Sequence, residues 1–573
     1  MKNVKEAANF IWSIADLLRG DYRQSDYGKV ILPLTVLRRL DCVLDATKAK
    51  VLKEYEQMKS SNIQNLDPIL NRAAGLKFHN HSAFDFNKLI ADPNNIAANL
   101  RNYINGFSEE AREIIEQFEF DNQITKLDDN NLLFMVMKRF QEVDLHPKTV
   151  SSMDMGYMFE ELIRKFAELS NETAGEHFTP REVIKLMVNI LFMDDRQALT
   201  QKGIVKTIYD CCAGTGGMLS VAEEYLNELN PDARLEVFGQ ELNPESYAIC
   251  KSDMLIKGQN PSNIKKGNSI SEDKLPAEKF DYLITNPPFG VKWEKYAKVV
   301  REEHESLGHG GRFGAGLPSV SDGSFLFLMH LMSKMKPTDK GGSRLAIVFN
   351  GSPLFSGSPS SKKNESSIRQ WVIENDLLEA VIALPSQLFY NTGISTYIWV
   401  ISNHKPKNRK GKVQLINAVE FFKKMSKSLG DKRNELSDEH IAQITQLYGD
   451  FEENQYVKVF DNPDFGYSKV TVERPLRDEN GNIIKDKKGP KPDASLRDTE
   501  NIPLKEDISE YMKREVLPHV PDAWIDETKT NIGYEINFTK YFYQYKPLRS
   551  LEEIRADILA LEQETDGLIK EVI

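Results

Sequence analysis

The sequence contains few cysteines and lacks any long hydrophobic run. Its 573 residues include only four cysteines, at positions 42, 211, 212 and 250, and these show no metal-ligand spacing. Such sparse usage fits a reducing compartment, so we expect neither disulfides nor a metal site. No run of about 18 apolar residues could span a bilayer. The first twenty residues have the pattern of an amphipathic helix, not of a signal peptide, and we expect a cytoplasmic protein without a membrane segment.

An excess of positive charge is also absent. The formal net charge is −11, whereas contacts to phosphates come from Lys and Arg. The composition therefore argues against a protein that binds nucleic acid by bulk electrostatic attraction alone, and any nucleic-acid role needs a local basic surface or a partner. The ten histidines include His304, His309 and His330, but none is paired at metal-ligand spacing, and we expect core or surface roles for them.

The hydrophobic pattern divides the chain into regions of different structure. A single core stops growing at about 250 to 300 residues, so the chain is long enough for two or three domains. Residues 1–165 have helical periodicity with almost no strand signal. Residues 166–425 alternate short β-rich runs with helical stretches, which is typical of βαβ units and a parallel sheet. Residues 426–545 predict an irregular, charged α+β region with a hairpin turn at Asn480 and Gly481, and residues 546–573 are helical again.

A glycine-rich turn follows the first predicted strand, in "IYDCCAGTGGML" at residues 208–219. Gly214, Gly216 and Gly217 allow a tight turn and the close approach of a ligand, and the following helix offers its N-terminal amides to a negative group. Alone, such a turn can be purely structural. The next predicted strand, however, ends at Glu241, whose carboxylate can accept hydrogen bonds from ribose hydroxyls. Because the G-x-G-x-x-G spacing and a Walker lysine are missing, S-adenosylmethionine is favoured over NAD and ATP.

The fourth predicted strand ends in the sequence "NPPF", residues 286–289. In open α/β sheets the carboxyl ends of the strands line the ligand site. The side chain of Asn286 and the carbonyl of Pro287 can both accept hydrogen bonds from one amino group, and Pro287 and Pro288 fix the directions of these acceptors. Phe289 offers a flat face to an extruded base. The motif predicts a clamp for an amino group such as that of adenine, although an isolated match would be explained as a strand-terminating turn.

In these motifs and their order, the chain resembles the N-6 adenine DNA methyltransferases, specifically the modification subunits of type I restriction-modification systems. The resemblance covers nearly the whole chain and includes "GEHFTP", "DCCAGTGG", "GQELNP", "TNPPFG", "SRLAIVFNGSPLFSG" and "NIGYEINFTKYFY". It implies a Rossmann-like α/β sheet with an all-helical N-terminal domain, which would clamp DNA or serve assembly, and a C-terminal helical tail. The implied reaction is the transfer of a methyl group from S-adenosylmethionine to the amino group of a flipped adenine.

The resemblance also assigns residues to the site. Asn286, Pro287, Pro288 and Phe289 are the implied catalytic residues, and Asn268 stands where the family often has Asp near the cofactor adenine. The implied cofactor-binding residues are Glu176, His177, Phe178, Thr179, Pro180, Arg181, Asp210, Ala213, Gly214, Thr215, Gly216, Gly217, Glu241 and Asn268.

The implied partners are double-stranded DNA, a specificity subunit that selects the DNA sequence, and a restriction subunit in the full complex. Two modification subunits are expected for each specificity subunit. The C-terminal segment carries apolar residues at alternating spacings of three and four, a seam that needs a partner helix or packs back on its own chain. The resemblance favours docking to the specificity subunit. The seam consists of Leu551, Ile554, Ile558, Leu561, Thr565, Leu568 and Val572.

Three other functions fit the sequence less well. Protein-glutamine methyltransferases grip an amide in the same way, but they carry Tyr at the position of Phe289 and are much smaller. A non-enzymatic assembly subunit with a decayed site conflicts with the intact motifs. A self-contained restriction-modification fusion would need nuclease motifs and a target-recognition domain, and no convincing segment for either is found in the sequence.

Two further segments have open roles. The basic run "HKPKNRKGK" at residues 404–412 contacts phosphates or forms a solvated loop. Residues 291–316 carry mixed charge and many glycines, and we expect a mobile loop near the target base.

Overall fold

The structure is a computed structural model that describes residues 9–170, 179–193, 195, 199–360, 363–390, 392–486, 489–543 and 550–572. The chain forms two compact units, residues 1–536 and 537–573. The second unit contains the helices α21 (Phe538–Phe542) and α22 (Leu551–Val572). Among the described residues, no helix is long and apolar enough to cross a membrane.

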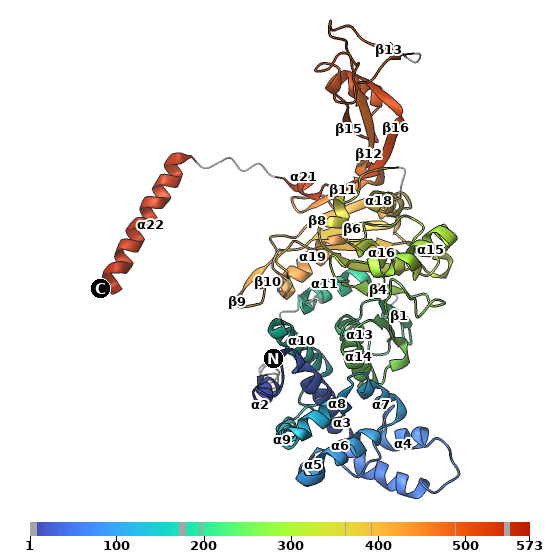
Figure 1. Ribbon diagram of the computed structural model, residues 1–573, viewed down its shortest axis with the longest axis vertical. Coiled ribbons are helices and arrows are strands. Elements are labelled where there is room, and N and C mark those ends of the chain that lie inside the picture. Colours follow the sequence, from blue (N-terminus) through green and yellow to red (C-terminus); the bar gives the residue numbers. More distant parts are fainter. Residues whose placement is uncertain are drawn as a thin grey trace. The chain divides into compact units, whose positions relative to one another are not determined.

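The N-terminal part of the first unit is helical (Figure 1). Its longest helix, α3 (Gly28–Met58), buries Leu32, Leu37 and Leu40 in a core shared with the surrounding helices. That core also contains Ala248 and Ile249 of a helix that flanks the β-sheet, so the helical part and the sheet share buried contacts. The remaining helices of this part are α2 (Ala15–Leu18), α4 (Asp67–Ala74), α5 (Phe86–Ile90), α6 (Ile96–Asn105), α7 (Glu109–Glu116), α8 (Phe120–Asp129), α9 (Leu133–Gln141) and α10 (Ser152–Ser170).

A nine-stranded sheet follows, with the strand order β11-β8-β6-β7-β5-β4-β1-β2-β3. The neighbours from β3 to β5 all pair in parallel. The strands are β1 (Val205–Asp210), β2 (Arg234–Glu241), β3 (Ile264–Lys266), β4 (Tyr282–Thr285), β5 (Arg344–Phe349), β6 (Leu378–Ala383), β7 (Tyr397–Ser402), β8 (Lys412–Asn417) and β11 (Val457–Asp461). Residues of β5 and β6 are buried along their whole length, which explains why their sequences read as continuous apolar runs.

The expectation of a parallel sheet in residues 166–425 is wrong at one strand, and β11 adds a second antiparallel strand. β7 runs antiparallel between β5 and β6, and β11 runs antiparallel to β8. A parallel neighbour needs a crossover connection, usually a helix. Residues 384–396 join β6 to β7, and their described part contains no helix, so the chain returns beside β6 in the opposite direction.

The helices that alternate with these strands along the chain are α11 (Arg181–Phe192), α13 (Gly217–Leu229), α14 (Pro244–Ile256), α16 (Ser324–Ser333), α17 (Ser352–Phe355), α18 (Glu365–Glu374) and α19 (Asp438–Asp450). α11 packs against both α13 and α19. The glycine-rich turn leads directly into α13, and β2 leads through a short loop into α14. These two strand-to-helix connections lie at the carboxyl ends of adjacent parallel strands, where a ligand site is expected.

The segment at residues 291–316 is a folded part of the first unit, in contrast to the mobile loop expected from the sequence. It contains α15 (Ala297–Leu307), and the ring of Trp293 is fully buried. The guanidinium of Arg312 forms an ion pair of 2.6 Å with the carboxylate of Glu303. The glycines of this segment therefore lie in turns next to a helix and not in a flexible loop.

Basic residues in the run at 404–412 are partly structural. Lys405 is buried and forms an ion pair of 2.6 Å with Asp376, while buried Arg409 donates a hydrogen bond of 2.9 Å to Gln414. Because both side chains are buried and engaged in contacts within the fold, they are not available to phosphates.

Three smaller sheets belong to the described part of the first unit. β12 (Gly466–Glu473) lies between β15 (Asp498–Pro503) and β16 (Trp524–Tyr534) in an antiparallel sheet, and β9 (Lys423–Leu429) pairs with β10 (Lys432–Glu435) in a hairpin. β13 (Lys485–Asp486) and β14 (Gly489–Pro490) form a third, short pair. The predicted turn at Asn480 and Gly481 is confirmed, because it lies between the antiparallel bridge partners Arg477 and Ile483.

Candidate active site

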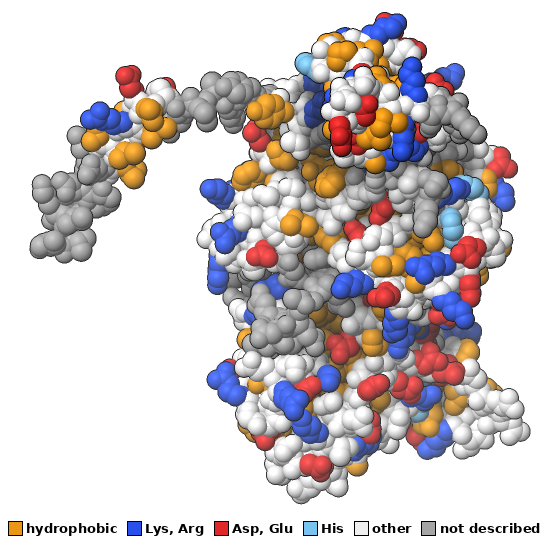
Figure 2. Space-filling view, turned by 45° about the horizontal axis from the view of Figure 1, so that its top comes forward, with side chains coloured by type: hydrophobic (Ala, Val, Ile, Leu, Met, Phe, Trp, Pro, Cys, Tyr) orange, Lys and Arg blue, Asp and Glu red, His pale blue; other side chains and the backbone are white. Residues whose placement is uncertain are grey.

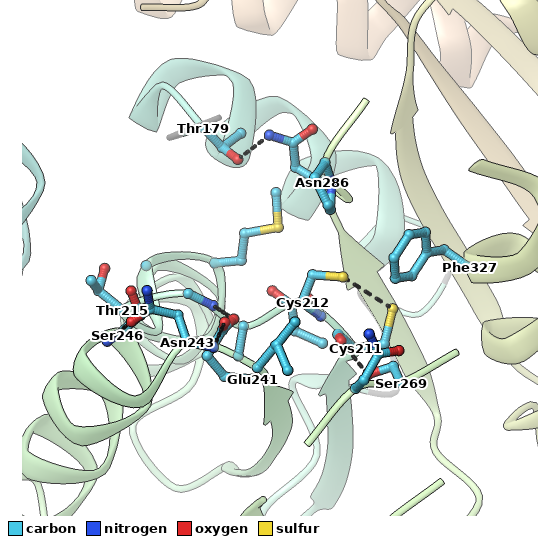
Figure 3. A pocket seen from close by; sticks show the side chains of 18 of the residues that line it. Thr179, Cys211, Cys212, Thr215, Glu241, Asn243, Ser246, Ser269, Asn286 and Phe327 are labelled. Atoms are coloured by element: carbon cyan, nitrogen blue, oxygen red, sulfur yellow. Dashed lines mark hydrogen bonds between the residues drawn. The ribbon is translucent and has the colours of Figure 1, made fainter. Parts of the chain in front are cut away.

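A cavity of about 480 Å³ lies at the carboxyl ends of β1, β2 and β4. Figure 3 shows Thr179 and Asn286 at one end of it and Glu241 with Asn243 at another. The volume lies within the range of about 300 to 1,000 Å³ that is usual for ligand sites. The predicted site residues that line the cavity are Thr179, Asp210, Ala213, Gly214, Thr215, Gly217, Glu241, Asn268, Asn286 and Pro288.

The glycine-rich turn requires glycine at two positions. Gly214 and Gly216 have φ angles of +53° and +86°, a region that other residues rarely adopt. A Cβ atom on Gly216 would lie 2.9 Å from Sγ of Cys250, whereas one on Gly214 would meet no atom within 4 Å. Gly216 is therefore needed for packing behind the turn, while Gly214 belongs to the wall of the cavity.

Glu241 is held at the tip of β2 by backbone amides. Its Oε2 accepts a hydrogen bond of 2.7 Å from the N–H of Gly214, and its Oε1 accepts one of 2.7 Å from the N–H of Asn243. The glycine turn and the predicted ribose acceptor are therefore one hydrogen-bonded assembly.

Asp210 connects the first strand with the fourth. Its buried carboxylate accepts hydrogen bonds from the N–H of Cys212 at 2.9 Å and from the hydroxyl of Thr285 at 2.7 Å. Burial raises the pKa of Asp210 to about 7, because the ionised form is poorly solvated there. Since Thr285 immediately precedes Asn286, Asp210 links the two predicted motifs directly.

The loop after β3 forms another wall of the cavity. The side-chain oxygen of Asn268 accepts hydrogen bonds from the N–H groups of Ile270 at 2.9 Å and Ser271 at 3.2 Å. Arg312 supports the same loop from behind, donating to the carbonyls of Ser269 at 2.7 Å and Ile270 at 3.0 Å. Arg312 thus fixes the backbone of residues that line the cavity without lining it.

A buried histidine completes this support. Arg312 donates to Nδ1 of His330 over 3.2 Å, and Nε2 of His330 lies 3.0 Å from the hydroxyl of Tyr209 on β1. Burial is the main cause that lowers the pKa of His330 to about 3. The imidazole is therefore neutral, with Nδ1 as its acceptor, and it serves the fold rather than proton transfer.

On the target side, Asn286 is oriented by Thr179. Its side chain is 8% exposed, and its amide nitrogen donates a hydrogen bond of 2.9 Å to the hydroxyl of Thr179 (Figure 3). Pro287 is buried, and Phe289 packs edge-to-face against Phe389 with ring centroids 6.3 Å apart. Asn286 and Pro288 line the cavity, whereas Pro287 and Phe289 do not.

The remaining predicted residues lie behind the cavity or outside the described residues. Pro180 precedes the first turn of α11, and Arg181 forms an ion pair of 3.1 Å with Glu160 on α10 and donates to the carbonyl of Gly217 at 3.2 Å. Arg181 thus supports the glycine turn without lining the cavity. Glu176, His177 and Phe178 lie outside the described residues.

Several residues that line the cavity were not predicted from the sequence. Asn243 and Pro244 begin α14 with a side-chain cap and a proline in the first turn, a signal that could have identified them. Phe327 comes from the apolar helix α16, and Glu160 comes from α10, and no local pattern marks either one. The lining residues missed are Glu160, Ile184, Cys211, Cys212, Met218, Leu242, Asn243, Pro244, Ser246, Gly267, Ser269, Ile270, Val291 and Phe327.

The chemistry of the cavity fits S-adenosylmethionine. Glu241 presents carboxylate oxygens suited to ribose hydroxyls, and Asp210 presents a second acidic group suited to the cationic methionine part. Leu242 and Ile270 add apolar walls suited to an adenine ring. No group of three or more metal-binding side chains occurs among the described residues.

Comparisons with known proteins agree with this chemistry. The N-6 DNA methylase family matches residues 151–483, and the family described as HsdM N-terminal domain matches residues 7–140. The chain is 26% identical to the type I restriction enzyme MjaIX methylase subunit of Methanocaldococcus jannaschii, over 82% of this chain and 81% of that protein. It is 29% identical to the HindI methylase subunit of Haemophilus influenzae, over 46% of this chain and 54% of that protein.

Solved structures confirm the expected fold. A type I restriction-modification methyltransferase subunit from Streptococcus thermophilus superposes with a TM-score of 0.63 at 25% identity, covering 81% of this chain and 97% of that one. A modification subunit of a type I restriction enzyme from Vibrio vulnificus shares the fold with a TM-score of 0.53 at 17% identity, covering 84% and 95%. The chain therefore belongs to the N-6 DNA methylase family, among the methylase subunits of type I restriction-modification systems, and is an adenine-specific DNA methyltransferase with S-adenosylmethionine as its cofactor.

Proposed function

We propose that the chain methylates the amino group of an adenine that has been flipped out of double-stranded DNA, at a sequence selected by a separate specificity subunit. The observation that carries this proposal is the position of Asn286, which lines the same cavity as Glu241 and Asp210. An adenine inside a duplex cannot bring its amino group into such a cavity, so the base must leave the stack.

Asn286 and Pro287 would hold the amino group of the adenine. The side-chain oxygen of Asn286 and the carbonyl of Pro287 accept its two hydrogens, and this directs the nitrogen lone pair out of the plane of the base. When bound, S-adenosylmethionine supplies a methyl group on a positively charged sulfur. Catalysis then rests on positioning and on hydrogen-bond acceptors fixed before the reaction.

Phe289 would stack on the flipped base and replace the neighbouring bases on which the adenine stacks in the duplex. Its ring packs edge-to-face on Phe389, and Phe289 follows Asn286 by three positions in the sequence. Stacking of this kind contributes about 1 to 3 kcal/mol per base.

Specificity would come from another subunit, docked through the C-terminal helix α22. Leu551 and Leu561 of the predicted seam are 85% and 67% exposed, and Ile558 is exposed between them. An apolar seam of this spacing suits a helix of the specificity subunit. Two copies of the chain per specificity subunit, joined by a restriction subunit, form the proposed complete assembly.

The direct test of the base clamp is Asn286→Ala. Methyl transfer by the complex with the specificity subunit should fall by about 100-fold or more, because an interaction made with the reacting group is lost. The affinity for S-adenosylmethionine, measured by calorimetry, should change by no more than about twofold, since Glu241 and Asp210 remain. Methyl transfer at the wild-type rate would refute the clamp.

A second experiment tests the partner. DNA from cells that express the chain with and without its neighbouring specificity subunit is sequenced for methylated adenine. Methylation of a split motif is expected only when both are present. Deleting residues 551–573 should abolish co-purification with the specificity subunit and methylation, while the truncated chain still binds the cofactor. A truncated chain that assembles and methylates normally would exclude α22 as the docking element.

A further inference from the structure

The hairpin of β9 and β10 packs against the chain segment that follows β6. The N–H of Asp431 donates to the carbonyl of Tyr390 at 2.8 Å, and the N–H of Arg433 donates to the carbonyl of Gln387 at 2.9 Å. β10 therefore lies between this segment and β9. β9 is the outer strand, and its described side chains are mostly exposed.

Lys432 anchors the hairpin to both segments that frame the target side of the cavity. It is buried, it forms an ion pair with Glu182 in the first turn of α11, and it donates to the carbonyl of Leu388 at 3.0 Å. Glu182 follows three residues after Thr179, which orients Asn286. Leu388 precedes Phe389, which packs on Phe289. The hairpin is thus fixed beside the "NPPF" motif.

The hairpin carries exposed Lys and Arg side chains that form no ion pairs with the described residues. Lys423, Lys424, Lys427 and Arg433 are exposed, and none of them forms an ion pair with any residue that the structure describes. The acidic residues of the hairpin are Asp431 and Glu435. Over most of the face drawn in Figure 2, Lys and Arg side chains are interspersed with Asp and Glu. In a chain with a net charge of −11, such a local basic surface can attract phosphates that the chain as a whole does not.

We propose that the β9–β10 hairpin binds the phosphate backbone of double-stranded DNA next to the flipped adenine. The inference rests on the proposed function, and it names the surface that holds the substrate of the same site. Contacts to the backbone phosphates fix the position of the duplex from which a base is flipped. Flexible lysines on an exposed strand suit phosphates because they need no fixed geometry.

Lysines on a free strand edge also prevent pairing with other chains. That role needs charge of either sign, and glutamate would serve it as well as lysine. Phosphate binding needs positive charge. Replacement by glutamine and by glutamate therefore separates the two roles, because only DNA binding should weaken further with glutamate.

The test uses the triple variant Lys423→Gln, Lys424→Gln and Lys427→Gln in the full chain, assembled with its specificity subunit. Binding of a duplex DNA of arbitrary sequence is measured by fluorescence anisotropy over a series of salt concentrations. Each phosphate contact that is removed lowers the slope of log K against log salt by about 0.9, so the slope should fall by about 2 to 3. The corresponding glutamate variant should bind more weakly than the glutamine variant at every salt concentration.

A matched control removes three exposed lysines at the amino ends of the strands, which lie opposite the carboxyl ends that form the cavity. Lys202, Lys279 and Lys340 precede β1, β4 and β5 at the amino ends of these strands, and the variant Lys202→Gln, Lys279→Gln and Lys340→Gln changes the net charge equally. Its salt slope should equal that of the wild type. A hairpin variant that matches the control in slope and affinity overturns the proposal.

Loss of co-purification with the specificity subunit in the hairpin variant would also overturn it, and would identify the hairpin as a protein interface instead. A failure of the hairpin proposal can be distinguished from a failure of the proposed function in DNA methylation. Asn286→Ala tests the chemistry in a chain with an intact hairpin, whereas the salt slope reports on DNA binding in a chain with intact Asn286.

Discussion

The cofactor side and the target side of the cavity are assembled from different kinds of contact. On the cofactor side, Glu241 binds the backbone of Gly214, which is 27 positions away, and the side chain of Asn268 binds amides two and three positions away. On the target side, the contact between Asn286 and Thr179 joins side chains 107 positions apart. Glu241 and Asn268 are thus held by backbone amides, whereas Asn286 is held by the side chain of a remote residue.

This difference implies that the two sides can be altered separately. A pocket held by backbone amides within adjacent turns is already shaped for its ligand, which limits the entropy lost on binding. Side chains from remote segments can change rotamer when a base arrives without disturbing that pocket. Substitutions at four positions test the separation.

The largest effect is expected for Glu241→Ala. A hydrogen bond to a charged group contributes about 1.5 to 3 kcal/mol, so loss of the ribose acceptor should weaken cofactor binding by about 100-fold. Calorimetry measures the affinity. Glu241→Gln retains one carbonyl acceptor, so its affinity for the cofactor should lie between that of the wild type and that of Glu241→Ala. If Glu241→Ala lowers the rate at saturating cofactor as strongly as it lowers affinity, the two sides are not separable.

Phe289→Ala should affect only the target side. Loss of about 2 kcal/mol of stacking lowers kcat/KM for DNA by roughly 30-fold, while Phe289→Tyr and Phe289→Trp retain most of the activity. Cofactor affinity should be unchanged in all three. An equal loss in all three variants would instead indicate that Phe289 acts by packing on Phe389.

Cofactor affinity should rise with pH through the titration of Asp210. Burial raises its pKa to about 7, and a bound cation favours the ionised carboxylate, so proton loss accompanies binding. Between about pH 6 and pH 8 the affinity should therefore increase by about tenfold, since roughly a tenth of the carboxylate is ionised one unit below its pKa. Calorimetric titrations across this range measure the effect. Asp210→Asn should remove the dependence, and an unchanged profile in that variant would assign it to another group.

Arg312→Lys should give the smallest effect. A lysine cannot donate in parallel to the carbonyls of Ser269 and Ile270, so the loop that lines the cavity is held less firmly. The loss of about 1 kcal/mol corresponds to an approximately fivefold higher KM for S-adenosylmethionine. The value of kcat should remain unchanged, because Arg312 touches neither the cavity nor Asn286. A lower kcat at unchanged KM would contradict a positioning role.

The parts of the site that the sequence predicted are those in which function and local conformation depend on the same residues. Glycines at 214 and 216 are required by positive φ angles, and Glu241 ends a strand, so composition and position both point to them. Fold class and cofactor followed from these motifs and from the resemblance that they support, and the family comparison confirms both.

The parts that the sequence did not predict depend on tertiary contacts. Phe327 reaches the cavity from a helix whose residues are nearly all apolar, so nothing distinguishes it from its neighbours. Arg312 lies in a glycine-rich, charged stretch that is typical of a loop, and only its contacts with Glu303, Ser269 and Ile270 reveal its role. The antiparallel direction of β7 depends on a connection without a helix, which strand patterns do not encode.

The ion pair between Glu160 and Arg181 sets a limit on how the chain can be shortened. Arg181 is buried, and its partner belongs to α10, before the residues that begin the sheet. A fragment cut immediately before α11 would lose Glu160, which lines the cavity, together with the ion pair that positions Arg181 against the carbonyl of Gly217. A minimal methyltransferase for biotechnological use must therefore begin before α10, at about residue 151, where the match to the catalytic family also starts.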